Sequence, residues 1–248
     1  CCKCMRKSIV IAGGGFAGVS ALHQAYKLGL TVNHDVILID KRGFFEYLPS
    51  LPYMLSGKKR REDLEIDLEN LVKKSGARLV MEEIVEIDSH SRTIKTVKNE
   101  YEFDFLVLGT GAEVEYFGVK GAEYSYPAYR IEDYERILGK LNKLKEEKDF
   151  CIVVVGGGLT GVEVAGELGE LYGEKVVLVE KMKCLLPFLK NPEASKVSEE
   201  YLTKELGIRV ITGAGVEKIE EKGVYLENGE YIPSDLTIWC TGIRASKI

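Results

Sequence analysis

Two glycine-rich turns contain the residues of this sequence that are best suited to chemistry. The turn "GGGFAG" includes Gly13, Gly15 and Gly18, and the turn "GGGLTG" includes Gly156, Gly158 and Gly161. In this spacing the first glycine permits a tight turn, the second lets the backbone approach a pyrophosphate, and the third lets a helix pack closely on a strand. The helix start offers free N–H groups and a positive dipole end to phosphates. The spacing predicts two dinucleotide sites, although such a turn can also join a strand and a helix without any ligand.

An acidic residue follows each turn at the end of the next predicted strand. Asp40 and Glu180 stand where a carboxylate accepts hydrogen bonds from ribose hydroxyls. A carboxylate also repels a 2′-phosphate, so Glu180 favours NAD over NADP, and the adjacent Lys181 makes that preference less than absolute. An enzyme with two such cofactors most simply passes a hydride between a nicotinamide and a flavin. Five further residues complete the candidate binding set, namely Phe16, Ala17, Lys41, Leu159 and Thr160.

The elements that must position these residues recur in the same order in both halves. An apolar strand is predicted over residues 8–12, a helix over 17–28 that ends at Gly29, and a strand over 36–39. The second half repeats this order with a strand at 151–155, a helix at 162–172 and a strand at 175–179. Each half is therefore predicted to be a βαβ unit, followed by short strands and an apolar strand that ends in Thr-Gly.

The rest of the chain predicts elements that connect and cover these units. An amphipathic helix is expected over 62–75, with Leu64, Leu68, Leu71 and Val72 on one face. Short strands are expected over 78–97, a buried strand over 101–108, a crossover linker over 116–129, and helices over 131–148 and 192–205, the last closed by Gly207. The tail predicts short strands, a hairpin at Asn228-Gly229 and a final strand over 236–240.

Composition excludes several other classes of protein. The net charge is −5, so nothing suggests nucleic acid as a partner. No apolar run reaches about 18 residues, and no leader pattern opens the chain, so we expect a cytoplasmic location and reduced cysteines. Gln24 is the single glutamine among many lysines and glutamates, which favours a thermophilic source.

Four segments together resemble the flavoproteins with two dinucleotide-binding domains, the pyridine nucleotide–disulfide oxidoreductase superfamily. They are "GGGFAG" with Asp40, "LVLGTGA", "GGGLTGVEVAGEL" with Glu180, and "DLTIWCTGI". Within it the sequence is most similar to the FAD-dependent type II NADH dehydrogenase group. The resemblance implies an α/β fold of two Rossmann-like domains with three-layer ββα sandwich character, the first one incomplete. It places the FAD-binding domain at residues 1–115 and the NAD(H)-binding domain at 116–248.

The resemblance also assigns roles to individual residues. It implies that the first turn and Asp40 bind FAD, that the backbone near Ile84 touches adenine, and that Thr110 and Gly111 lie beside the flavin. The second turn and Glu180 then bind NADH, and Thr241 and Gly242 line the same cleft, unless they are a plain strand-to-loop connection. Glu163 matches the residue that approaches the nicotinamide, where it would orient the carboxamide or tune charge beside the flavin. Its alternative is a helix-start carboxylate favoured by the dipole.

The cysteines decide between branches of this superfamily. Pro49 stands where disulfide reductases of this kind carry a redox cysteine, and no cysteine occurs between Cys4 and Cys151. A thiolate beside the flavin is therefore not expected, which leaves quinone, oxygen, a small redox protein or a dye as electron acceptor. A sulfide:quinone oxidoreductase is the alternative, with Cys151, Cys184 and Cys240 available. Cys1, Cys2 and Cys4 supply too few ligands for a closed metal site, and no metal is expected.

The resemblance predicts a further strand, a Gly-Asp pair and a C-terminal domain after the NAD-binding domain, and this sequence ends at Ile248. A truncated gene, a fragment and a reduced form that becomes a homodimer are the alternatives. Quinone and membrane contacts, at the inner face of the cell membrane, are expected in that further part. A nucleotide-binding module without redox turnover is the alternative from another functional class.

Overall fold

The computed structural model describes residues 6–248, so the pattern formed by Cys1, Cys2 and Cys4 lies outside the described residues. The described chain forms two compact units. The first contains residues 6–47, 65–113 and 244–248, and the second contains residues 48–64 and 114–243. The two units meet at residues 113–114, near the predicted domain boundary at residue 115. Residues 48–64, however, belong to the second unit and residues 244–248 to the first, so neither unit is one continuous range.

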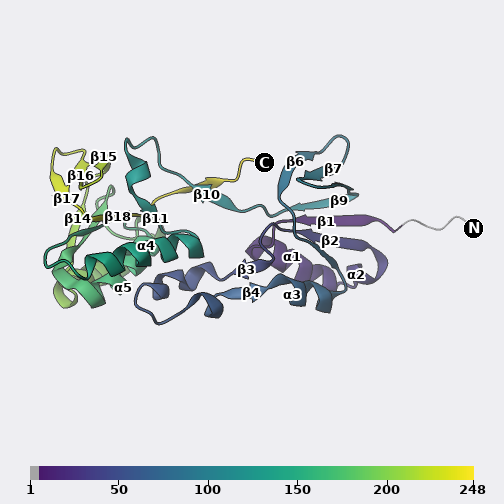
Figure 1. The fold of residues 1–248 in the computed structure, drawn as a ribbon, viewed down its shortest axis with the longest axis horizontal. Helices are drawn as coiled ribbons and strands as arrows, with labels where there is room; N and C mark the ends of the chain where they lie inside the picture. The colour runs from purple at the N-terminus through teal and green to yellow at the C-terminus, as the bar shows by residue number, and fades with distance from the viewer. Residues whose placement is uncertain (1–5) are drawn as a thin grey trace, which may run out of the picture. The chain divides into compact units, whose positions relative to one another are not determined.

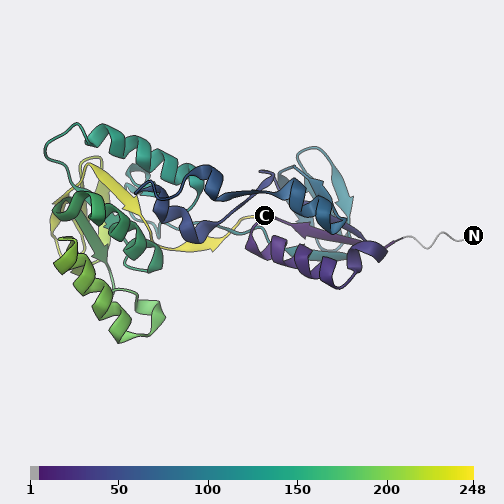
Figure 2. The same ribbon diagram turned by 90° about the horizontal axis from the view of Figure 1, so that it is seen from below.

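A four-stranded parallel sheet organises the first unit, in the order β5-β2-β1-β9. Its strands are β1 (Ser8–Ala12), β2 (Asp35–Ile39), β5 (Arg78–Val80) and β9 (Phe105–Leu108). Helices α1 (Phe16–Lys27) and α3 (Leu68–Ser75) cover one face and lie side by side, with the short α2 (Leu30–Asn33) next to α1 (Figure 2). An antiparallel sheet of β6 (Ile84–Asp88), β7 (Thr93–Thr96) and β8 (Glu100–Glu102) covers the other face (Figure 1).

Successive side chains of β1 pack into two separate hydrophobic cores, one on each face of the sheet. Ile11 packs with Leu38 and Leu68 on the helical side, whereas Val10 packs with Ile39 and Ile94 on the side of the antiparallel sheet. Successive strand residues point to opposite faces, so a strand covered on both sides must be apolar throughout. The unit is thus a three-layer ββα sandwich, as the family resemblance implied.

The second unit repeats this arrangement around a five-stranded parallel sheet in the order β11-β18-β12-β13-β14. Its strands are β11 (Tyr126–Pro127), β12 (Ile152–Val155), β13 (Val176–Glu180), β14 (Arg209–Thr212) and β18 (Leu236–Trp239). Helices α4 (Ile131–Leu144) and α5 (Leu159–Tyr172) cover one face, and α6 (Pro192–Glu200) runs on into a π turn, Tyr201–Glu205. Strands β15 (Val216–Glu220), β16 (Gly223–Leu226) and β17 (Tyr231–Pro233) cover the other face (Figure 1).

Short elements complete the chain. Strand β3 (Phe44–Glu46) pairs with β4 (Glu65–Asp67), and β10 (Ala112–Val114) pairs with β19 (Ile243–Ala245). The 3₁₀ turns are Leu48–Met54, Arg61–Asp63, Ala122–Tyr124, Gly173–Lys175 and Pro187–Leu189. Among residues 6–248, no helix is long and apolar enough to cross a bilayer.

Several local predictions are confirmed. Gly29 follows the end of α1 with a φ of +69°, and Gly207 closes the region after α6 with a φ of +70°, a backbone conformation that glycine adopts without strain. Gly229, at a φ of +86°, turns the chain between β16 and β17. The predicted hairpin at Asn228-Gly229 is therefore present.

The predicted helix over 62–75 is wrong. The segment is a 3₁₀ turn, strand β4 and then α3, which begins only after Asp67. The Asp67 carboxylate accepts a hydrogen bond from the Glu69 N–H at 2.8 Å, which caps the helix. Leu64 and Leu68, predicted to share a helical face, belong to different cores, Leu64 to that of the second unit and Leu68 to that of the first.

Three other predicted elements need smaller corrections. Residues 101–108 form two strands, β8 and β9, and the second is not buried, because Phe105 is 50% exposed and Leu108 is 63% exposed. The linker at 116–129 contains a 3₁₀ turn and strand β11, which pairs with β18. The helix predicted over 131–148 ends at Leu144, and the helix predicted from 162 begins at Leu159.

Substitution of Asp67 tests this break in the helix. We expect Asp67→Ala to lower the free energy of unfolding by about 1 kcal/mol, because it removes the cap of α3. In a continuous helix over 62–75 the same change would be stabilising, because alanine is the better interior helix former. Urea denaturation gives the sign. Glu62→Ala is the control, since its ion pair with Arg60 is long and exposed and should contribute almost nothing.

Candidate functional site

The first glycine turn brings strand β1, helix α1 and the end of β9 into close contact. Gly13 has a φ of +102°, and its N–H donates to the carbonyl oxygen of Ile39 at 2.8 Å. A Cβ added at Gly13 would lie 2.2 Å from the carbonyl oxygen of Gly109, and a Cβ at Gly18 would lie 1.8 Å from that of Gly13. Only glycine fits at these two positions, so α1 is held directly against β1.

The second turn has the same construction. Gly156 has a φ of +106° and donates its N–H to the carbonyl oxygen of Val179 at 2.7 Å. A Cβ at Gly161 would lie 1.7 Å from the carbonyl oxygen of Gly156. The close approach of helix to strand that the spacing predicts is thus present in both units.

The second glycine of each spaced motif, Gly15 or Gly158, leaves the start of the following helix open. A Cβ at Gly15 or Gly158 would meet nothing within 4 Å, and neither residue provides a side-chain cap to the helix that it precedes. Within residues 6–248 the N–H groups of Phe16, Ala17, Leu159 and Thr160 have no hydrogen-bond acceptor. Free N–H groups at the positive end of a helix dipole suit an anionic group such as a pyrophosphate.

The two acidic residues are fixed by backbone N–H groups next to these openings. The Asp40 carboxylate accepts from the N–H of Gly14 at 2.7 Å and from that of Arg42 at 2.8 Å. Glu180, which is buried, accepts from Gly157 and Met182, both at 2.6 Å. Each carboxylate oxygen has a further lone pair, so both residues can still accept hydrogen bonds from ribose hydroxyls.

A cavity of about 650 Å³ opens at the second turn. Its lining includes five of the predicted residues, Gly156, Gly158, Glu180, Thr241 and Gly242. A smaller hollow of about 230 Å³ shares Thr241 and Gly242 with it and adds Thr160. The cavity is the right size for a nucleotide, and it lies at the carboxyl ends of the strands, where open α/β sheets bind ligands.

Thr241 has an unusual environment in this cavity. Its Oγ1 is buried without a hydrogen-bond partner among residues 6–248. A Cβ at Gly156 would lie 2.6 Å from the Thr241 Cγ2, so this side chain packs directly on the turn. Buried hydroxyl groups normally have partners, and one that lines a cavity is available to a polar group of a ligand.

Glu163 is the fifth residue of α5, just after its first turn, and it lines neither of these two hollows. Partial desolvation raises the pKa of its carboxyl, and it makes no ion pair with a described residue. Its contact with a nicotinamide therefore stays a prediction.

The remaining predicted residues of the first unit surround the carboxyl ends of its sheet. The Ser246 hydroxyl donates a hydrogen bond to the Thr110 hydroxyl at 2.8 Å, and Gly111 has a φ of +77°. Lys41 donates to Glu83 at 2.9 Å, directly before Ile84 at the start of β6. Lys41 and Ile84 are thus brought close to Asp40.

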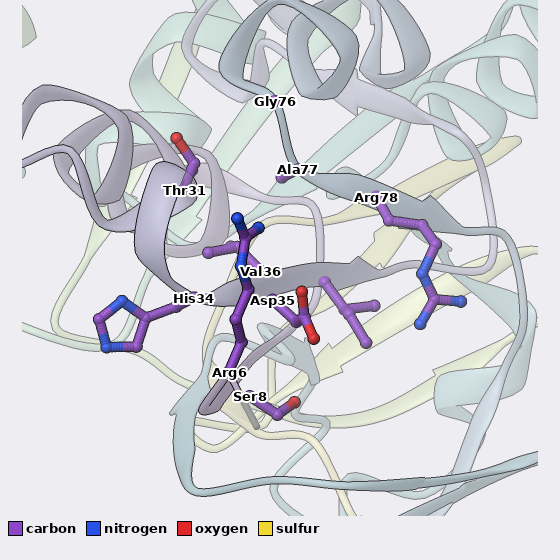
Figure 3. A pocket seen from close by; sticks show the side chains of 10 residues that line it. Arg6, Ser8, Thr31, His34, Asp35, Val36, Gly76, Ala77 and Arg78 are labelled. Carbon is purple, nitrogen blue, oxygen red and sulfur yellow. The ribbon is translucent and has the colours of Figure 1, made fainter. Parts of the chain in front are cut away.

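A hollow in the first unit lies at the opposite end of its sheet, where the strands begin (Figure 3). It is lined by Arg6, Ser8, Thr31, Asp35 and Arg78, with Ser8, Asp35 and Arg78 at the first residues of β1, β2 and β5. Ligands of open parallel sheets bind at the carboxyl ends instead. This hollow is therefore not part of the candidate nucleotide site.

Most residues that line the large cavity were not among the predicted site residues, and three of them have side chains that a ligand could contact. Met182 and Phe188 contribute exposed apolar surface, and Phe188 is 88% exposed. Glu227 contributes a carboxylate that pairs with Lys181. Glu227 directly precedes the Asn228-Gly229 hairpin, but no pattern in the sequence places that hairpin beside the end of β13.

Two of the three described cysteines, Cys151 and Cys240, have environments unsuited to nucleophilic attack. Desolvation raises the pKa of the Cys240 thiol well above its ordinary value and also raises that of Cys151. Cys184 is exposed. No group of three or more metal-binding side chains is assembled in residues 6–248.

Comparison with known proteins agrees with this geometry. Residues 7–248 match the family described as Pyridine nucleotide-disulphide oxidoreductase. The chain is 26% identical over 268 residues to the type II NADH:quinone oxidoreductase of Staphylococcus haemolyticus, an alignment that covers 98% of this chain and 66% of that protein. The corresponding protein of Staphylococcus aureus is 27% identical over 270 residues, again with 98% and 66% covered.

Solved structures share the fold. The structure of NDH2 from Plasmodium falciparum in complex with NADH has a TM-score of 0.86 at 22% identity, covering 97% of this chain and 56% of that chain. The sulfide:quinone oxidoreductase of Aquifex aeolicus has a TM-score of 0.79 at 24% identity, covering 94% and 58%. The chain thus spans slightly less than two thirds of the length of the curated relatives that it matches. Nothing in these comparisons supports the expected thermophilic source.

The glycines of the second turn give a paired test of this geometry. We expect Gly161→Ala to lower the thermal midpoint strongly, because its Cβ would overlap the carbonyl oxygen of Gly156. Gly158→Ala should unfold within a few degrees of the parent chain, because its Cβ meets open space at an ordinary φ of −73°. Equal losses in the two variants would contradict the close approach of helix and strand.

Alkylation of the folded chain tests the reactivity of the three described thiols. At pH 8 we expect iodoacetamide to modify Cys184 at least about tenfold faster than Cys151 or Cys240, because the two raised pKa values leave little thiolate. Peptide mapping by mass spectrometry separates the sites, and the same reaction in urea should bring the three rates together. Rapid modification of Cys240 in the folded chain would instead support chemistry that uses a cysteine.

Proposed function

We propose that this chain, which belongs to the pyridine nucleotide-disulphide oxidoreductase family, is an FAD-dependent NADH oxidoreductase. The family is one of FAD-dependent NAD(P)H oxidoreductases. The observation that carries the proposal is the duplication of one site: in each unit an open helix start lies beside a carboxylate that is already fixed by two backbone N–H groups. Two such sites suit two dinucleotides.

We assign FAD to the first turn and NADH to the second. In the first unit, the N–H groups of Phe16 and Ala17 bind the pyrophosphate of FAD, and Asp40 accepts from its ribose. Lys41 and Ile84 border the adenine end, and Thr110 and Gly111 line the path toward the flavin. When bound, FAD supplies the chemistry, because it accepts a hydride from NADH and passes the electrons on.

In the second unit, Leu159 and Thr160 offer their N–H groups to the pyrophosphate of NADH, and Glu180 accepts from the adenine ribose. Thr241, which lines the cavity and has a hydroxyl without a partner among the described residues, can then pair with a polar group of the dinucleotide. We keep Glu163 as the residue that orients the nicotinamide, because its carboxylate lies on α5 close to the second turn, and desolvation raises the pKa of this carboxyl.

A quinone is the electron acceptor that we favour. The curated relatives named above are NADH:quinone oxidoreductases, and neither Cys151 nor Cys240 supports an acceptor that needs a thiolate. The likeness to the Aquifex structure concerns the fold, and the raised thiol pKa values give no support to sulfide chemistry.

The visible spectrum of the purified chain, after incubation with FAD, tests the proposal. Bound oxidised flavin absorbs near ~450 nm, and we expect NADH to bleach that band without oxygen and a quinone to restore it. A colourless chain that still binds NADH would be a nucleotide-binding module. Bleaching by sulfide but not by NADH would identify the sulfide-oxidising alternative.

Two matched variants assign the cofactors to the turns. We expect Glu180→Ala to weaken NADH binding at least about tenfold while flavin is retained, and Asp40→Ala to do the reverse, because each removes one ribose acceptor and unpairs local N–H groups. Flavin content is measured by absorbance and NADH affinity by fluorescence titration. Each variant is the folding control for the other, and equal loss of both cofactors in either one contradicts the assignment.

A further inference from the structure

We propose that Glu227 is a specificity-determining residue of the second turn, because it holds Lys181 and thereby keeps the cavity selective for a dinucleotide without a 2′-phosphate. The inference rests on the proposed function, since it assumes that this cavity binds NADH. It concerns a question that the sequence leaves open, namely why a lysine next to the ribose acceptor does not recruit NADPH.

Lys181 is the residue of this cavity that is best able to bind a 2′-phosphate. It directly follows Glu180, and among the described residues that line the cavity it is the single lysine or arginine. Sites for NADP place a cation beside the ribose for this purpose. A lysine at this position, if unpaired, would offset the repulsion between Glu180 and a phosphate.

The structure shows that Lys181 is already paired. Its Nζ lies 2.8 Å from Oε1 of Glu227, and both side chains line the cavity. The side chains are 69% and 48% exposed, so the pair stands at the rim, where solvent screens it but a bound nucleotide can reach it. A 2′-phosphate would therefore meet two carboxylates and a lysine whose charge is balanced.

The position of Glu227 depends on a backbone hydrogen bond and on the space left by a neighbouring glycine. Its N–H donates to the carbonyl oxygen of Gly215 at 2.8 Å. A Cβ at Gly215 would lie 2.7 Å from Oε2 of Glu227, so the absence of a side chain there leaves room for this carboxylate. The hydrogen bond from Lys181 lowers the pKa of Glu227, which favours the charged form of this carboxylate.

The first unit contains the same arrangement with different residues. Asp40 is followed by Lys41, whose Nζ lies 2.9 Å from Oε1 of Glu83. These side chains are 60% and 53% exposed, close to the values of the second pair. The recurrence indicates a shared device in which the lysine after the ribose acceptor is neutralised, and it provides a matched control.

The test compares dissociation constants for NADH and NADPH, measured by fluorescence titration at low ionic strength. In Glu227→Gln, which keeps the shape and removes the charge, we expect the preference for NADH over NADPH to fall about two- to fivefold, the range of one exposed charge contact. In a Lys181→Met background the same change should alter the preference less than half as much on a logarithmic scale. Glu83→Gln, the matched control in the first unit, should leave the preference for NADH over NADPH unchanged.

Two results would overturn the inference: an unchanged preference in Glu227→Gln, or an equal change with and without Lys181, which would mean simple loss of repulsion by Glu227. Circular dichroism confirms that each variant is folded. If the unsubstituted chain is folded and binds neither nucleotide, the proposed function itself fails. NADH binding with an unaltered preference overturns the role of Glu227 alone.

Discussion

The structure depends on one close contact, repeated in each unit, between the third glycine of a turn and the carbonyl oxygen of the first. A Cβ would lie 1.8 Å from that oxygen at Gly18 and 1.7 Å from it at Gly161, so no other residue can occupy either position without moving the helix. The contact sets the helix directly on the end of the strand. It thereby aims the free N–H groups of the helix start at the space above the carboxyl ends of the sheet, where a phosphate can bind.

The carboxylates belong to the same construction. Asp40 and Glu180 each accept hydrogen bonds from two backbone N–H groups, one of them from Gly14 or Gly157, so a ribose bound as we propose would meet a carboxylate that the fold has already oriented. Such preorganisation lowers the free-energy cost of ordering these side chains when a ligand binds. The lysine after each acid introduces a charge of the opposite sign, and in both units a glutamate from a distant segment balances it.

The protein's part in the proposed reaction is mainly to bind and position. Among the described thiols, desolvation raises the pKa values of Cys151 and Cys240, and Cys184 is exposed. In the proposed reaction the two dinucleotides would supply the hydride chemistry, and the chain would supply backbone donors, the carboxylates of Asp40 and Glu180 and the hydroxyl of Thr241. This division of labour agrees with membership in a family of FAD-dependent NAD(P)H oxidoreductases.

The sequence by itself determined whatever depends on neighbouring residues: the glycine turns, the apolar strands before them, the acids after them, and the hairpin at Asn228-Gly229. Those features follow from backbone geometry and local patterning, which a few consecutive residues specify. Only the tertiary structure decided where the apparent helical periodicity of residues 62–75 is interrupted. Leu64 and Leu68 have helical spacing, but each is buried in a different core, and the burial outweighs the local preference. It also decided the pairing of Lys181 with Glu227, because a contact between residues so far apart in the chain exists only once β13 and β16 are folded into the same unit.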